Sequence, residues 1–232
     1  MLRSHLLSVA QFLAIAASAA AACVSVSAAS RTCDCQQSEF RVDSDDPQDA
    51  GDACWAALAV AAFFEELGFT KSVPITVSIV ENMPSALGTN ALASFTPASR
   101  LIQLLSFSAA HARGAWFGRA LDRSLYRSMA GHEVAHALAW SNVATDKLSV
   151  RAREYVAYVA MFATMDPAHR EAILAEVPGD GFADAAEMSE IYYYLDPSRF
   201  GVEAYRHYLR PDAGPTFLRA VLKGDELPDQ DD

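Results

Sequence analysis

Residues 121–136 of the chain read LDRSLYRSMAGHEVAH, and this stretch decides the helical part of the fold. Its apolar residues and its histidines recur at steps of four and three positions, which is the spacing of one face of an α-helix. No proline interrupts the sequence from Ala98 through Asp166, so a helix is free to run through the stretch. The positions on the predicted stripe are Leu121, Leu125, Met129, His132 and His136.

The last five residues of that stretch, His132 to His136, form an HExxH motif. Histidines four residues apart on a helix lie on the same face, so both imidazoles are able to reach one Zn²⁺ ion. Glu133 stands beside them without being a ligand, in the position of a general base that activates water. Catalytic zinc usually takes three protein ligands, so the motif predicts a third ligand elsewhere in the chain.

Glu154 is the third ligand that we expect. A second helix is predicted to start near Thr145 or Ser149, and Glu154 lies on it among apolar residues at helical spacing. A buried carboxylate is either paired or coordinates a metal, and the alternative to a metal here is an ion pair with Arg127 or Arg151. Four weaker ligand candidates are Asp146, Asp166, His169 and His207.

With the HExxH motif followed by Glu154 in the segment REYVAY, residues 153–158, the chain resembles the gluzincin zinc peptidases, and most closely their compact minigluzincin type among secreted bacterial proteins. The resemblance covers residues 73–165. It implies a predominantly helical, zincin-like α+β fold, in which a small mixed sheet packs on the HExxH helix and on a second, glutamate-bearing helix. The asparagine and aspartate that flank this glutamate in the thermolysin group are absent. A metzincin arrangement is excluded, because Ala139 and Asn142 stand where glycine and histidine are needed.

The resemblance further implies a zinc metallopeptidase, a hydrolase in which Zn²⁺ is held by His132, His136 and Glu154. Glu133 takes a proton from the attacking water and passes it to the leaving amine. A donor that stabilises the transition state is also expected, commonly a tyrosine or a histidine. The possible stabilisers are Tyr158, His207 and the run Tyr192, Tyr193 and Tyr194.

Two other functions fit the motif. The first is a non-catalytic periplasmic binding or scaffold protein with a vestigial or structural zinc site, although such a site has no use for Glu133. The second is a zinc hydrolase that acts on bonds other than peptide bonds. The motif alone does not distinguish these functions from a peptidase.

Upstream of the motif, residues 73–79 alternate apolar and polar positions, which predicts a strand with one buried face. Residues 91–95 and 100–107 predict a hairpin around a turn at residues 96–99. We expect residues 91–95 to be the edge strand above the cleft, because small side chains let the backbone of an extended peptide approach and pair. An ordinary hairpin arm is the alternative.

Helical segments surround this predicted centre. The first spans residues 50–67 and ends at Gly68. One domain is expected over residues 30–224, followed by a disordered acidic tail at residues 225–232. The arm at residues 31–49 is a candidate for a latent pro-region that covers the cleft. The later helices are predicted at residues 167–176, 183–195, 197–209 and 213–223.

Residues 1–29 have the pattern of a secretory signal peptide, with a basic start, an alanine-rich apolar centre and small residues at the end. Cleavage is expected after Ala22 or after Ala29. The mature protein is then exported to the periplasm or the extracellular space, with no stable membrane insertion. A lipid-modified Cys23, giving a lipoprotein, is the alternative.

Three cysteines follow Ala29, which is an odd number. In an oxidising compartment a disulfide from Cys33 or Cys35 to Cys54 would tie the N-terminal arm to the first helix and leave one thiol free. We take Cys35 and Cys54 as the possible pair. A cysteine zinc site is disfavoured, because the three residues show no CxxC spacing.

The 232-residue chain carries a formal net charge of −11. Nucleic-acid phosphates require basic patches on a protein, so we expect no nucleic-acid partner. The same charge disfavours binding to an anionic membrane surface. The expected partner is a peptide or protein substrate, and the sequence does not indicate an oligomeric state.

Overall fold

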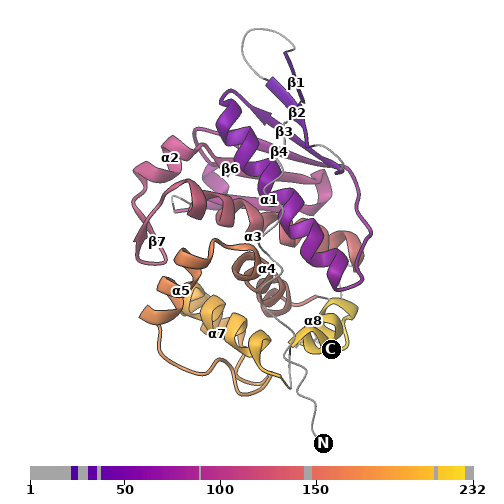
Figure 1. Cartoon of the computed structure of the whole chain (residues 1–232), viewed down its shortest axis with the longest axis vertical. Coiled ribbons are helices and arrows are strands. Elements are labelled where there is room, and N and C mark those ends of the chain that lie inside the picture. Colours follow the sequence, from indigo (N-terminus) through magenta and orange to yellow (C-terminus); the bar gives the residue numbers. More distant parts are fainter. Residues whose placement is uncertain are drawn as a thin grey trace, which may run out of the picture.

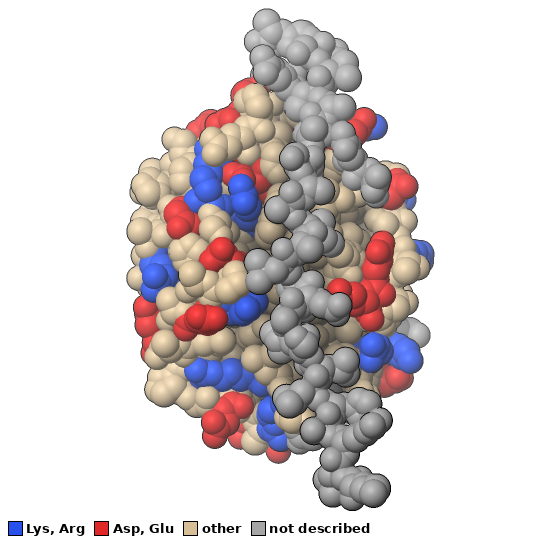
Figure 2. Space-filling view, viewed as in Figure 1, with Lys and Arg blue, Asp and Glu red and all other residues tan. Residues whose placement is uncertain are grey.

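The computed structural model describes residues 22–25, 31–35, 38–88, 90–143, 148–211 and 214–227. The fold is α+β and predominantly helical, with one small mixed sheet above a group of helices (Figure 1). On the face shown in Figure 2, acidic and basic side chains are interspersed, and the basic ones occur in separate small groups. Among the described helices, none combines the length and the apolar character needed to cross a bilayer.

The main sheet has the strand order β1-β2-β3-β4-β6-β5. Strands β3, β4 and β6 are parallel, whereas β1, β2 and β5 pair antiparallel with their neighbours. The predicted strand at 73–79 is present as β4, and the predicted hairpin is present as β5 and β6. Because β5 ends the strand order, the prediction that this strand is an edge is confirmed. The bounds are β1 Ala22–Ser25, β2 Arg31–Asp34, β3 Phe40–Ser44, β4 Ile75–Val80, β5 Ala93–Thr96 and β6 Leu101–Leu105.

The N-terminal arm belongs to this sheet, which corrects the expectation of a latent pro-region at residues 31–49. Strand β3 alternates buried and more exposed positions, and its Phe40 and Val42 are buried in the core. It runs parallel to β4, far along the strand order from the edge strand β5. The described part of the arm is therefore built into the core and does not cover the centre beside β5.

Helices α1 (Pro47–Glu66) and α3 (Arg123–Asn142) pack against each other on one face of the sheet, α1 over β3 and β4 and α3 over β5 and β6. The α1 helix begins at Pro47 because Asp46 caps it, accepting a hydrogen bond from the N–H of Gln48. Asp122 caps α3 in the same way, through the N–H of Leu125 at 2.9 Å.

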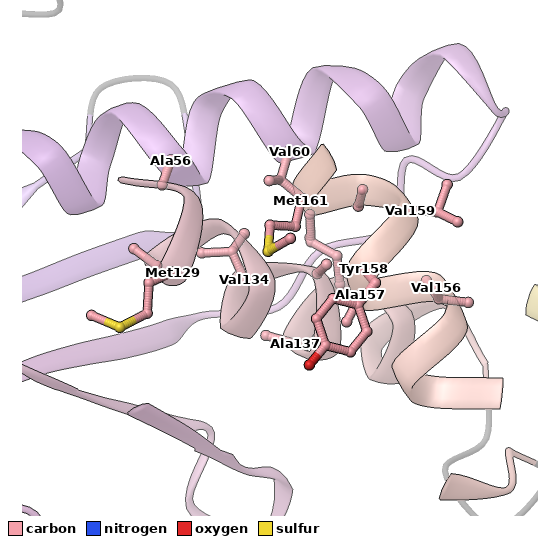
Figure 3. Close-up of a cluster of buried hydrophobic side chains, with 14 of the residues drawn as sticks. Ala56, Val60, Met129, Val134, Ala137, Val156, Ala157, Tyr158, Val159 and Met161 are labelled. Atoms are coloured by element: carbon pink, nitrogen blue, oxygen red, sulfur yellow. The ribbon is translucent and has the colours of Figure 1, made fainter. Parts of the chain in front are cut away.

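Helix α4 (Val150–Thr164) forms the next layer and packs on both α1 and α3. It begins directly after Ser149, one of the two predicted starts, whose hydroxyl accepts the N–H of Ala152. Apolar side chains of α1, α3 and α4 meet in one cluster, where Val60 and Met161 face each other (Figure 3). This buried layer fixes how α3 and α4 lie side by side.

Of the remaining elements, α5, α7 and α8 lie in the lower half of Figure 1, whereas α2 lies beside β6 in the upper half. The predicted helix at 183–195 is wrong in its first half, because helix α6 begins only at Glu190. Before it, the side chains of Asp184 and Glu187 accept hydrogen bonds from backbone N–H groups in turns, and these turns compete with a helix.

The predicted strand at 100–107 also ends early, because Ser106 caps a short helix. The bounds of the remaining elements are α2 Phe107–Ala112, β7 Ala115–Trp116, β8 Arg119–Ala120, α5 Pro167–Glu176, α6 Glu190–Leu195, α7 Pro197–Leu209 and α8 Gly214–Lys223.

The two ends of the chain need corrections. The expected disordered tail starts too early, since Leu227 is buried and its carbonyl accepts a hydrogen bond from the Ser149 hydroxyl. Residues 228–232 lie outside the described part. Most of the predicted signal segment lies outside it too, although β1 falls within residues 1–29 and pairs with β2.

A disulfide joins Cys35, just after β2, to Cys54 on α1, with the two Cα atoms 5.2 Å apart. It links the sheet to the first helix, as expected for one of the two predicted pairings. Cys33 is disulfide-bonded as well, so the expectation of one free thiol is wrong.

Candidate metal centre

The two motif histidines and Glu154 converge at the contact between α3 and α4. The Nε2 atoms of His132 and His136 lie 3.1 Å apart. The Glu154 carboxylate reaches both rings, with Oε2 at 3.3 Å from His132 Nε2 and Oε1 at 3.4 Å from His136 Nε2. We call these three residues the His–Glu cluster.

Local structure explains the convergence. On α3 the two histidines are separated by four residues, so their rings leave the same face of the helix. Glu154 is in the second turn of α4, whose start is fixed by Ser149. The alternative pairing with Arg127 is not used, because the Arg127 guanidinium donates to Asp52 Oδ1 at 2.6 Å.

The cluster fits a tetrahedral metal ion. With metal–nitrogen and metal–oxygen distances of about 2.0–2.2 Å, ligand atoms of a tetrahedral zinc site lie about 3.3–3.5 Å apart. The three separations between ligand atoms, 3.1, 3.3 and 3.4 Å, are close to this value. Glu154 Oε2 is buried and forms no hydrogen bond within the described part of the chain. Two imidazoles and one carboxylate are also a ligand set typical of catalytic zinc.

Burial and neighbouring charges shift the pKa values of the three residues in the metal-free cluster. Burial lowers the pKa of His136 to about 4. Burial also disfavours the charged forms of His132 and Glu154. The contact with Glu154 outweighs burial and raises the pKa of His132, while His136 and His132 together lower the pKa of Glu154. A metal ion replaces such a proton-mediated contact by coordination of the neutral imidazoles and the carboxylate.

Glu133 is on the α3 helix beside the cluster and is itself not among the converging ligands. Burial raises the pKa of its carboxyl to about 7, and the repulsion from Glu154 adds to this rise. His132 and the backbone N–H of Phe95 act in the opposite direction. Glu133 therefore lies close to the edge strand β5, a proximity that the sequence did not reveal.

Tyr158 forms one wall of the cluster. Its ring packs on the His132 imidazole, with ring centroids 4.5 Å apart. Figure 3 shows the hydroxyl pointing away from α1 and out of the apolar cluster. Burial raises the pKa of this hydroxyl well above its usual value, and the carboxylates of Glu154 and Glu133 add to the rise. On its other side the ring rests on α7, where a Cβ at Gly201 would lie only 2.5 Å from Tyr158 Cδ1.

A second tyrosine reaches the cluster from α6. Of the predicted tyrosine run, Tyr193 lies near the Glu154 carboxylate, and its hydroxyl helps to lower the pKa of Glu154. Burial raises the pKa of Tyr193 itself. The sequence contains three adjacent tyrosines. Ser189 caps α6 and so fixes where the helix begins, and this position determines which of the three faces the cluster.

The other predicted residues lie elsewhere. His207 on α7 accepts or donates a hydrogen bond with the Tyr155 hydroxyl at 2.9 Å and packs on Phe217 in the core, so the structure does not bring it to the cluster. His169 contacts Asp122 at the start of α3. Asp166 caps α5 through the N–H of Ala168. Asp146 lies outside the described residues.

Comparison with known proteins gives one result. The sequence model of a protein family described as "Family of unknown function (DUF6639)" matches residues 40–231. This span contains every residue of the His–Glu cluster and all described elements from β3 onward. Neither the curated proteins nor the solved structures gave a match to the chain.

Proposed function

The chain belongs to DUF6639, a family of unknown function, and from the geometry of the His–Glu cluster we propose that it is a zinc-dependent peptidase. The observation that carries the proposal is the convergence of His132, His136 and Glu154 at separations suited to one tetrahedral ion, with Glu133 beside them. The sheet that packs on the HExxH helix, and the glutamate on the following helix, support a zincin-like fold of the gluzincin kind.

Zinc at this cluster would supply a Lewis acid that polarises the substrate carbonyl and acidifies water. The chain itself supplies the proton transfer, since the Glu133 carboxylate is positioned to accept a proton from the attacking water and donate it to the leaving amine. The Phe95 N–H lies near that carboxylate and favours its ionised form. Tyr158 supplies a buried hydroxyl directed out of the apolar core, which is suited to donate to developing negative charge.

Strand β5 supports a peptide as the substrate. It pairs with β6 on one side and ends the strand order on the other, so its outer edge has backbone groups for an added strand. Phe95 belongs to this strand, and its N–H is close enough to Glu133 to lower the pKa of that carboxyl. A peptide that adds to β5 therefore lies next to the general base.

An exported location suits this activity. The Cys35–Cys54 disulfide is of the kind that persists in oxidising compartments such as the periplasm or the extracellular space. The apolar N-terminal segment with a basic start has the pattern of a secretory signal. We therefore place the peptidase outside the cytoplasm.

Zinc analysis combined with hydrolysis of an unspecific protein substrate such as casein tests the proposal. Wild-type protein is expected to hold about one zinc ion per chain and to cleave the substrate. Glu154→Ala should lose zinc and activity, whereas Glu133→Gln should keep zinc and lose activity. Glu171→Ala, which removes an exposed carboxylate on α5, is the matched control and should change neither.

The outcomes separate the competing functions. Metal-free wild-type protein, or stoichiometric zinc in Glu154→Ala, would contradict the assigned site. Zinc without cleavage of any peptide would leave the site intact and remove the peptidase. Activity that survives Glu133→Gln would exclude Glu133 as the general base.

A further inference from the structure

A cavity of about 390 Å³ lies between the β7–β8 hairpin, the end of α5 and the start of α7. Its walls are largely apolar, with the Phe117 ring and the buried Ile173 on one side. We call it the Phe117 pocket. It is within the size range of small-ligand sites in proteins. The lining residues that matter below are Phe117, Ile173, Glu176, Val177, Asp196 and Arg199.

The pocket adjoins the His–Glu cluster through two aromatic rings. Phe117 packs edge-on against Tyr158, with centroids 6.2 Å apart, and Tyr158 packs on His132. Asp196 at the opposite rim is close enough to Tyr158 to contribute to its raised pKa. The Phe117 and Tyr158 rings therefore stand between a group bound in the pocket and the cluster.

The backbone at Phe117 indicates that its side chain is needed there. Phe117 and Gly118 form the two-residue turn of the β7–β8 hairpin, with φ values of 51° and 70°. Asparagine and glycine are the usual residues in such a turn, and a bulky residue at positive φ costs roughly 1–2 kcal/mol. Phe117 nevertheless occupies this position and places its ring between the pocket, Tyr158 and Phe162.

The charged groups at the rim already have partners. Glu176 pairs with Arg119 at 3.1 Å, and Arg199 pairs with Glu203 at 3.8 Å. Asp196 accepts the N–H of Arg199 as the cap of α7. The charges of Glu176 and Arg199 are thus compensated by their partners, Asp196 accepts a backbone N–H, and the apolar walls provide most of the contact surface for a ligand.

We propose that the Phe117 pocket receives an apolar side chain of the substrate, so that the enzyme selects peptides with a large aliphatic or aromatic residue near the cleaved bond. This proposal rests on the proposed peptidase function, because that function defines the substrate. The pocket itself is formed by residues outside the HExxH and Glu154 segments. Burial of a leucine or phenylalanine side chain in such a pocket is expected to improve binding ten- to a hundredfold over glycine.

Binding to zinc-loaded Glu133→Gln protein tests the pocket without relying on turnover. The probes are two series of end-blocked hexapeptides of alanine, with glycine, leucine, phenylalanine or lysine on either side of the central bond. Calorimetry should show the expected ten- to hundredfold preference for leucine or phenylalanine over glycine and lysine in one series. Val177→Trp, which fills the pocket from a half-buried position, should abolish that preference, and Ser198→Phe should do so from the opposite wall.

The control is Leu209→Trp, which adds the same ring at an exposed position of α7 and should keep the preference. Equal binding of all peptides, no binding of any, or a preference that survives both filling variants would overturn the proposal. Wild-type cleavage is measured on the same peptides. A preference in binding without cleavage by wild type would support the pocket and contradict the peptidase, so the two failures are distinct.

Discussion

Helix α3 contributes to two groups of charged residues, one shared with α1 and one with α4, and they differ in how their charges are balanced. Near the start of the helix, Asp49 and Asp52 of α1 are almost completely buried, and each is met by a guanidinium from Arg123 or Arg127. We call these four residues the Asp–Arg cluster. Two turns further on, the Glu154 carboxylate faces two imidazoles and keeps one buried oxygen without a hydrogen bond.

This difference in charge balance distinguishes the Asp–Arg cluster, which is suited to a structural role, from the His–Glu cluster, which is suited to a chemical one. In the Asp–Arg cluster, further contacts complete the balance, since Asp49 accepts the Phe107 N–H and the Phe107 and Trp55 rings cover the two guanidinium groups. Such a group needs no ligand. The His–Glu cluster presents only lone pairs or shared protons toward its centre, and a divalent cation, if bound there as proposed, would balance its charge.

The largest expected difference is the response to zinc. With free zinc at about a thousand times its dissociation constant, binding to the native state alone stabilises the protein by about 4 kcal/mol. Urea unfolding of chelator-treated protein, with and without added zinc and with disulfides intact, measures this gain. Asp52→Asn should keep the gain, because its cluster holds no metal, whereas Glu154→Ala should lose most of it. An equal gain in both variants would show that the two clusters do not differ in this way.

Removal of a charge from the Asp–Arg cluster should act on stability alone. Asp52 is 2% exposed in its side chain, whereas Arg123 and Arg127 are 26% and 39% exposed. The stranded cations therefore partly reach water, and we expect Asp52→Asn to cost about 2–3 kcal/mol, less than the about 3–5 kcal/mol of a fully buried pair. Urea unfolding at neutral pH measures the loss, and the zinc content should stay unchanged.

The matched control for that loss is Asp34→Asn, which breaks an exposed ion pair with Arg41 and should change stability little. If Asp52→Asn is as mild as this control, the Asp–Arg cluster is not the structural tie between α1 and α3. If it releases zinc, the two clusters are coupled through α3.

Gly201→Ala should disturb the His–Glu cluster through the Tyr158 ring. The new Cβ would lie 2.5 Å from Tyr158 Cδ1, so the ring that covers His132 has to move. We expect a loss of about 1–3 kcal/mol in unfolding free energy, typical of overpacking, together with a fall in kcat for peptide hydrolysis. Gly51→Ala on α1, where nothing lies within 4 Å of the added Cβ, is the control and should be neutral or stabilising. Equal effects of the two variants would remove Tyr158 as a fixed wall.

Much of the His–Glu cluster was predictable from the sequence because its ligands follow helical spacing. The steps between Leu121 and His136 indicated one face of α3, and a carboxylate among apolar neighbours singled out Glu154. Both helices were confirmed, with the second starting at one of the two predicted residues, Ser149. The edge strand β5 was also predicted correctly from its small residues and flanking turn.

What the sequence did not indicate depends on contacts between segments far apart in the chain. The proximity of the Phe95 N–H to Glu133 requires the packing of β5 on α3, and the fit of Gly201 against Tyr158 requires the crossing of α4 and α7. His207 has the composition of a site residue but is used in the core with Tyr155. The short strands β2 and β3 were not predicted. They have only four and five residues, and so short an alternation of apolar and polar residues, next to two cysteines, is not distinguished from a loop.

The smallest expected effect concerns Asp122, which caps the helix that carries both clusters and belongs to neither. Although burial opposes it, hydrogen bonds from the Leu125 N–H and His169 lower the pKa of Asp122 below its ordinary value of 3.8. The ionised form is therefore favoured by folding, so its contribution is complete above about pH 3.8 and is lost as the pH falls through the lowered pKa. Asp122→Ala should cost about 0.5–1 kcal/mol at neutral pH, as for an exposed helix cap.

Urea unfolding of wild type and Asp122→Ala between pH 7 and pH 3 measures this difference, which should be constant above pH 4 and shrink below it. Asp122→Asn is the informative companion, because asparagine still caps the helix but carries no charge. It should recover most of the stability at neutral pH and differ from Asp122→Ala by the same amount at every pH. A difference between wild type and Asp122→Ala that grows on acidification would contradict the sign of the pKa shift and the role of Asp122 as an ionised cap.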